Sequence, residues 1–153
     1  RVKNLDEVQI FSVEPKISLG NIIDFDAKKS RRNLIAGYYD AMRMIYGLKG
    51  SIYYIDAPDE ERFYLDRLAA HGPEGGLRQF LEKSLDQTAH ELKLSSDWTY
   101  QELYLGILEA AAKLLRLRKY RIYTLAELES AVAARKNELT DNKKIPQFVG
   151  VLL

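Results

Sequence analysis

The sequence contains no cysteine, only two histidines and no long apolar run. The lack of cysteine excludes disulfide bonds, thiolate zinc sites, iron–sulfur clusters and cysteine nucleophiles. No stretch approaches the roughly 18–20 apolar residues of a membrane-spanning helix, and no signal peptide is visible. We therefore expect no membrane partner, and the missing cysteines favour a cytoplasmic location.

Catalytic motifs are also scarce. His71 and His90 are isolated, and surface or capping roles are expected for both. His90 and its following glutamate begin like the His-Glu-x-x-His zinc motif, but Leu94 occupies the second histidine position. The sequence lacks a glycine-rich phosphate loop and a Gly-x-Ser-x-Gly elbow. No cofactor is predicted, and these absences argue against an enzyme.

A pair of aspartates is the single candidate metal site. Asp24 and Asp26 could offer carboxylates to a divalent ion, with Asp40 as a third ligand. The same residues also fit the end of a strand or the cap of the following helix. We predict no bound metal, and a metal-dependent enzyme using Asp24 and Asp26 stays as a third alternative.

The composition is that of an ordinary globular protein. The chain has 153 residues, of which 46% are hydrophobic and 29% charged, and the net charge is +1. This length favours a single helical domain over residues 1–153 with a substantial core. The first residue is Arg1 and the last five are mostly apolar, which favours a fragment or subunit of a larger assembly. Because the net charge is small, any affinity for nucleic acid must come from a local patch.

Hydrophobic periodicity predicts mostly helices. Residues 1–26 are expected to form a short strand or β-hairpin extension, because β-formers at residues 7–13 are stopped by Pro15. Helical spacing then predicts five helices, starting near residues 28, 56, 77, 99 and 124, with a short terminal helix near Pro146. Glycines end the first at residues 47 and 50, and Thr-x-x-Glu capping boxes open the last two. The predicted fold is mainly α, a compact bundle of about five helices with a short N-terminal hairpin.

Seven residues on the apolar stripes are predicted to be buried. They are Leu34, Tyr38, Phe80, Leu85, Ile107, Leu114 and Leu128. The chain also has ten tyrosines, some adjacent, as in Tyr38-Tyr39 and Tyr53-Tyr54. Because neighbouring residues on a helix cannot both face the core, one member of each pair should reach solvent or a partner. Tyr39 and Tyr53 are therefore candidate partner-binding residues. Phe148, in the apolar C-terminal segment, is a third.

The clearest functional signal is a run of seventeen residues without an acid between Glu109 and Glu127. Within this run lies a basic segment, residues 113–121, and Tyr123 comes two residues after it. The candidate nucleic-acid-binding residues here are Lys113, Arg116, Arg118, Lys119, Tyr120, Arg121 and Tyr123. If the preceding helix continues this far, Lys113, Arg116 and Tyr120 share one face. Guanidinium groups suit phosphates and tyrosine rings stack on bases, although the run also fits a solvated face. A second basic group, Lys28, Lys29, Arg31 and Arg32, opens the first long helix.

These features predict a non-enzymatic helical module of a larger nucleoprotein assembly that contacts the nucleic-acid backbone. Small helical subunits of replication complexes or CRISPR effectors have this size and class. The alternative is a protein–protein scaffold that binds other subunits through its tyrosine pairs and apolar C-terminus.

Overall fold

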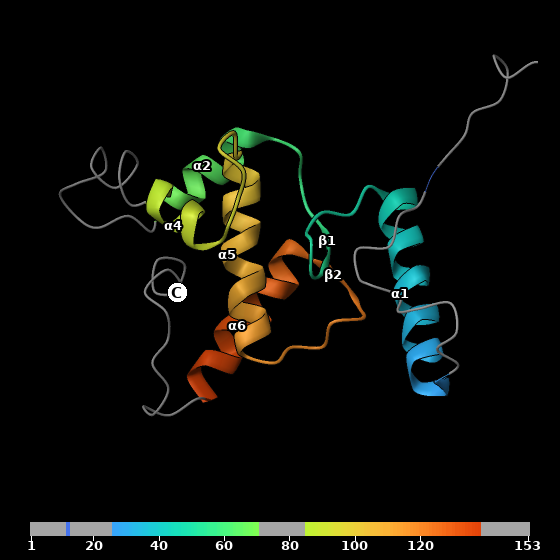
Figure 1. Cartoon of the computed structure of the whole chain (residues 1–153). Coiled ribbons are helices and arrows are strands. Elements are labelled where there is room, and N and C mark those ends of the chain that lie inside the picture. Colours follow the sequence, from blue (N-terminus) through green and yellow to red (C-terminus); the bar gives the residue numbers. More distant parts are fainter. Residues whose placement is uncertain (1–11, 13–25, 71–84, 139–153) are drawn as a thin grey trace, which may run out of the picture. The chain divides into compact units, whose positions relative to one another are not determined.

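The computed structural model describes residues 12, 26–70 and 85–138. In these residues five helices and two short strands are found, so the fold is mainly helical, as predicted (Figure 1). The chain divides into two compact units, Arg1–Gly47 and Leu48–Leu153. The expected N-terminal hairpin and terminal helix lie outside the described residues, as does Phe80.

The described part of the first unit is helix α1, Ala27–Tyr46. It begins at Asp26, whose carboxylate accepts the backbone N–H of Lys28 at 2.7 Å. It ends at Gly47, which adopts the left-handed conformation with φ of +63°. The prediction that Leu34 and Tyr38 are buried is wrong, since they are 75% and 58% exposed. Apart from α1, no helix or strand is described in this unit that could cover them.

The second unit is built around helix α5, Tyr100–Leu114. Helices α2 (Glu61–Ala70), α4 (Leu85–Glu91) and α6 (Leu125–Glu138) all pack against α5. Leu85, Ile107 and Leu128 are at most 1% exposed, which confirms their predicted burial. Leu114 is 45% exposed, so its predicted burial is wrong. Ala111, Ala112 and Leu115 around it are buried, so Leu114 lies on the side of the helix end that is turned away from the core.

Local capping signals set the starts of two helices. Thr99 and Glu102 form the predicted capping box at α5, with each side chain bonded to the other residue's backbone N–H. Thr124 and Glu127 form the second box at α6, with distances of 2.9 and 3.2 Å. Helix α2 begins at Glu61 rather than near residue 56, because Asp56 belongs to a strand.

The parallel pairing of two short strands was not predicted, and the sequence left residues 52–55 open between a strand and the start of the next helix. Strand β1 (Tyr54–Asp56) pairs with β2 (Ile122–Thr124), with Tyr54 opposite Ile122. Tyr53 and Tyr54 are 2% and 4% exposed, so the expectation that one of them reaches solvent is wrong. That expectation assumed a helix, whereas these residues enter a strand covered on both faces.

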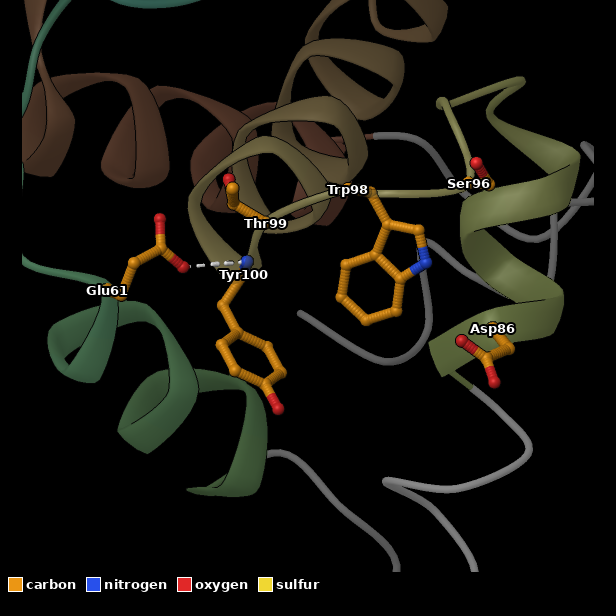
Figure 2. Close-up of a pocket in the computed structure, with 6 residues that line it drawn as sticks. All are labelled: Glu61, Asp86, Ser96, Trp98, Thr99 and Tyr100. Atoms are coloured by element: carbon orange, nitrogen blue, oxygen red, sulfur yellow. Dashed lines mark hydrogen bonds between the residues drawn. The ribbon is translucent and has the colours of Figure 1, made fainter.

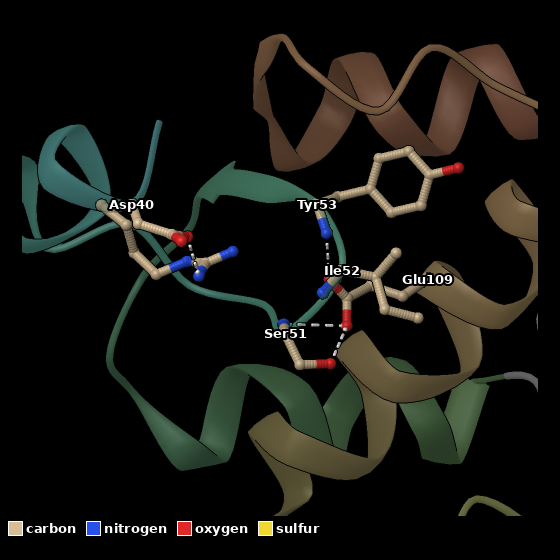
Figure 3. A network of polar contacts seen from close by, with 6 residues as sticks. Asp40, Ser51, Ile52, Tyr53 and Glu109 are labelled. Atoms are coloured by element: carbon tan, nitrogen blue, oxygen red, sulfur yellow. Dashed lines mark hydrogen bonds and ion pairs between the residues drawn. The ribbon is translucent and has the colours of Figure 1, made fainter. Parts of the chain in front are cut away.

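The loop before β1 is held by a buried carboxylate of α5. Glu109 is 3% exposed, and its Oε2 accepts both the backbone N–H and the hydroxyl of Ser51 at 3.0 Å (Figure 3). Its Oε1 accepts the backbone N–H groups of Ile52 and Tyr53 at 2.8 and 2.7 Å. Gly50 closes the turn with φ of +88°, where a Cβ atom would lie 2.5 Å from Oε1. Glu109 thereby fixes the entry to β1.

A polar triad joins three helices of the second unit. Glu129 of α6 accepts hydrogen bonds from Arg67 of α2 and from the hydroxyl of Tyr104 of α5, both at 2.5 Å. Burial, and then the hydrogen bond to Glu129, raise the pKa of Tyr104 to about 12. Tyr104 therefore stays a neutral donor that bridges α5 to α6.

Candidate nucleic-acid interface

The basic segment is not a continuation of α5. The helix ends at Leu114, and Arg116 takes the left-handed conformation with φ of +57°. The Arg116 N–H donates to the carbonyl of Lys113 at 3.1 Å, and the Leu117 N–H to that of Ala112 at 3.0 Å. These two bonds form a Schellman motif with arginine at the position where glycine is usual. The expected shared helical face of Lys113, Arg116 and Tyr120 is therefore wrong.

Two buried tyrosines attach the backbone of the basic segment to the core. The Tyr53 hydroxyl donates to the carbonyl of Leu117 at 3.2 Å, and the Tyr123 hydroxyl donates to that of Arg118 at 2.8 Å. Burial chiefly, and then electrostatic interaction with Tyr123 and Glu109, raises the pKa of Tyr53 to about 12, so its hydroxyl remains a donor. Leu115 adds a third attachment, since its side chain is 5% exposed in the core. The part of the basic segment that follows α5 is thus a fixed loop rather than a free one.

The cationic side chains of the basic segment are exposed, one on the last turn of α5 and four on the loop that follows. They are those of Lys113, Arg116, Arg118, Lys119 and Arg121. Arg121 is partly engaged, because it lies 3.5 Å from Glu127 and its guanidinium sits over the Tyr123 ring at 4.9 Å. The side chains of the other four have no ion pair with any residue that the structure describes. The loop therefore presents a net positive charge to solvent.

The Arg121 contact also affects the acid that opens α6. The pKa of Glu127 lies below its usual value, first because the Thr124 backbone N–H bonds its carboxylate and also because Arg121 is close. Glu127 is therefore ionised at neutral pH. It offsets part of the charge of Arg121, whereas the charges of Lys113, Arg116, Arg118 and Lys119 have no ion-pair partner among the described residues.

The two tyrosines near the basic segment differ in accessibility. Tyr123 is 4% exposed and packs edge-to-face on Tyr53 at 6.2 Å, so its ring is a core element and not a stacking surface. Tyr120 is half-buried and keeps part of its surface accessible. A base that stacks here would therefore meet Tyr120.

The second basic group lies on the other unit. Lys28, Lys29, Arg31 and Arg32 are all exposed in the first turns of α1, and that first turn contains no acid. Helix N-termini favour negative charge, so these cations gain nothing from the helix dipole.

The predicted partner-binding residues are dispersed. Tyr39 is half-buried on α1 and packs edge-to-face against Tyr38, with ring centroids 5.3 Å apart. Tyr53 is a core residue, as described above, and its ring is closed to a partner. Phe148 lies outside the described residues.

The candidate metal ligands have structural roles where they are described. Asp26 is the N-cap of α1, and Asp40, 6% exposed, accepts a hydrogen bond from Arg43 at 3.0 Å. Asp24 falls outside the described residues. Within the described ranges, no cluster of three potential metal ligands occurs, and no helix is long and apolar enough to span a membrane.

Sequence reasoning missed how the basic segment is built. Arginine gives no signal of a left-handed helix end, whereas glycine would have done so. The β-formers at residues 122–124 were the available sign that the helix had already ended. Comparison of the chain with protein-family models, curated proteins and solved structures gave no match.

Proposed function

We propose that this chain is a non-enzymatic helical module of a larger nucleoprotein assembly, and that the basic segment contacts the nucleic-acid backbone. The observation that carries the proposal is a basic segment with five exposed cations, one on the last turn of α5 and four on the fixed loop that follows, inside seventeen residues that contain no acid. Lysine and arginine that neutralise phosphates release counterions, which supplies most of the affinity of such contacts.

The fixed backbone supports this proposal on energetic grounds. A disordered basic segment loses conformational entropy when it binds, whereas a loop attached through Leu117 and Arg118 has been ordered by folding. Contacts to phosphates carry no sequence information, so we expect binding that is independent of base sequence. Tyr120 is the residue beside these cations that can add stacking on an unpaired base.

Two helix ends provide a matched pair of variants. Lys93 follows α4 in the same Schellman geometry as Arg116, with φ of +58° against +57°. The Lys93 N–H donates to His90, and the Leu94 N–H to Ala89, both at 3.0 Å. Arg116→Gly and Lys93→Gly therefore remove one exposed cation each and relieve the same backbone strain. Both should keep the free energy of unfolding within about 1 kcal/mol of the wild-type value.

Binding of a labelled single-stranded oligonucleotide of mixed sequence, followed by fluorescence anisotropy at low salt, tests the proposal. Arg116→Gly should raise the dissociation constant about three- to tenfold. Lys93→Gly should change it less than twofold, because Lys93 lies outside the basic segment. Equal losses in both variants would show a dependence on net charge alone, and absence of wild-type binding would refute the proposal.

A protein–protein scaffold is the second candidate, and the surface of α1 favours it. Leu34, Ile45 and Tyr46 are 75%, 67% and 63% exposed, which is unusual for large apolar side chains on one helix. If the chain has no affinity for oligonucleotides, and Ile45→Glu changes its association state in sedimentation velocity, this candidate replaces the first.

A further inference from the structure

A hollow of about 500 Å³ lies in the second unit, away from the basic segment in sequence. Its lining comes from α2, α4, the start of α5 and the loop that precedes α5. The described residues that line it are Glu61, Asp86, Ser96, Trp98, Thr99 and Tyr100. Two are carboxylates, two are aromatic and none is basic. The hollow therefore has a negative character that contrasts with the basic segment.

Two aromatic rings form adjoining walls of this hollow. The rings of Trp98 and Tyr100 have centroids 5.7 Å apart and an interplanar angle of 79°, so they meet almost at a right angle. Both rings are half-buried and pack against the core, which fixes their orientation. The face of an aromatic ring carries partial negative charge and attracts cations. Two perpendicular rings thus offer an attractive corner to a positively charged group.

The carboxylates stand on either side of the rings (Figure 2). Glu61 is held in place, because its Oε2 accepts the Tyr100 N–H at 2.8 Å and the Gln101 N–H at 3.4 Å. Asp86, on α4, is exposed and has no hydrogen bond or ion pair with any residue that the structure describes. Its two oxygens remain available to accept hydrogen bonds from a ligand.

We propose that this hollow binds a guanidinium group, as presented by an arginine side chain of a partner protein. A guanidinium is planar, so it stacks on the Trp98 indole, and it donates paired hydrogen bonds that match the Asp86 carboxylate. A quaternary ammonium would use the rings but cannot donate to Asp86. The site does not depend on nucleic-acid binding.

Trp98 is the single tryptophan of the chain, so its fluorescence reports on this site alone. Titration of the full chain with N-acetyl-arginine amide should give a saturable change with a dissociation constant in the millimolar range. The citrulline analogue, which replaces the guanidinium by a neutral urea, should give no saturable change. N-acetyl-tryptophan amide serves as the control for collisional quenching.

Variants locate the interaction. Asp86→Asn and Tyr100→Leu should each raise the dissociation constant about three- to fivefold. Asp97→Asn removes the same charge from an exposed residue that does not line the hollow, and it should have an effect below twofold. Circular dichroism of each variant checks that the fold is retained.

Three results would overturn the proposal. The first is equal binding of the arginine and citrulline compounds, since the charge would then be irrelevant. The second is saturation by choline without saturation by the arginine compound, which would assign the site to quaternary ammonium groups. The third is the absence of any saturable change.

Discussion

Replacing Glu109 by glutamine tests how the loop before β1 is held. The carboxylate accepts four hydrogen bonds, two at each oxygen, and three of the donors are backbone N–H groups. Glutamine has one oxygen and one NH₂ group. If the NH₂ group replaces Oε1, it faces the N–H groups of Ile52 and Tyr53, and both lose their acceptor. If it replaces Oε2, the hydroxyl of Ser51 can turn to accept, but the Ser51 N–H cannot.

The expected loss of stability is estimated for the less damaging orientation, in which the NH₂ group replaces Oε2. One part-buried backbone donor, the Ser51 N–H, loses its acceptor, which costs at most about 1–3 kcal/mol. The bonds of Ile52 and Tyr53 change from charged to neutral acceptors and become roughly half as strong. Relief of the buried charge offsets part of this loss. We therefore expect Glu109→Gln to lower the free energy of unfolding by about 2–4 kcal/mol.

Urea unfolding followed by far-ultraviolet circular dichroism measures this change. With a slope typical of small proteins, the midpoint should fall by about 1–2 M. Glu91→Gln is the matched control, because the Glu91 side chain is exposed and makes no hydrogen bond or ion pair with any described residue. It should change the free energy by less than about 0.5 kcal/mol. A Glu109→Gln midpoint equal to that of the control would refute the role assigned to the carboxylate.

Two further predictions concern the same core. Gly50→Ala should clearly lower the melting temperature, because the new Cβ atom would lie 2.5 Å from Glu109 Oε1 and 2.9 Å from the carbonyl oxygen of Tyr53. The φ of +88° at this position adds backbone strain for any residue but glycine. An unchanged melting temperature would contradict this packing. Tyr53 and Tyr104, each with a pKa raised to about 12, should stay protonated when exposed tyrosines ionise near 10, as followed by ultraviolet absorbance. The stability that these two groups contribute is complete below pH 10 and is lost as the pH rises towards 12, since the folded state binds their protons more tightly. Ionisation of all tyrosines in one step near 10 in the folded protein would contradict their burial.

Local signals predicted the helices well. The capping boxes at Thr99 and Thr124 and the left-handed glycine at residue 47 act through neighbouring residues, so the sequence contains the whole interaction. The apolar stripe of α5 likewise identified Ile107 as core, because Leu103, Ile107 and Ala111 all pack inward, whereas Leu114 does not.

Non-local contacts were beyond such signals. Strands β1 and β2 have three residues each and pair across a long stretch of chain, so neither has a readable alternation of its own. Tyr53 was expected at a surface because nothing nearby in sequence shows that Glu109 draws the loop into the core. The stripe of α1 was expected to be buried, but a stripe shows that a face is apolar and not what covers it.

For the basic segment, the sequence predicted the positive charge but not the conformation of the backbone that carries it. The absence of acids and the exposure of the cations follow from composition. The ending of α5 at Leu114 depends on Arg116 adopting a conformation that arginine seldom takes. The attachment of the loop depends on hydroxyl groups of buried tyrosines from two separate segments.

The salt dependence of oligonucleotide binding tests the central claim most directly. If the basic segment neutralises phosphates of a single strand, log affinity falls linearly with log salt, with a slope of about −0.7 for each contact. Arg116→Gly should then reduce the steepness of the wild-type slope by about 0.7, and Lys93→Gly should leave it unchanged. A wild-type slope near zero, or one that Arg116→Gly does not alter, would contradict the account.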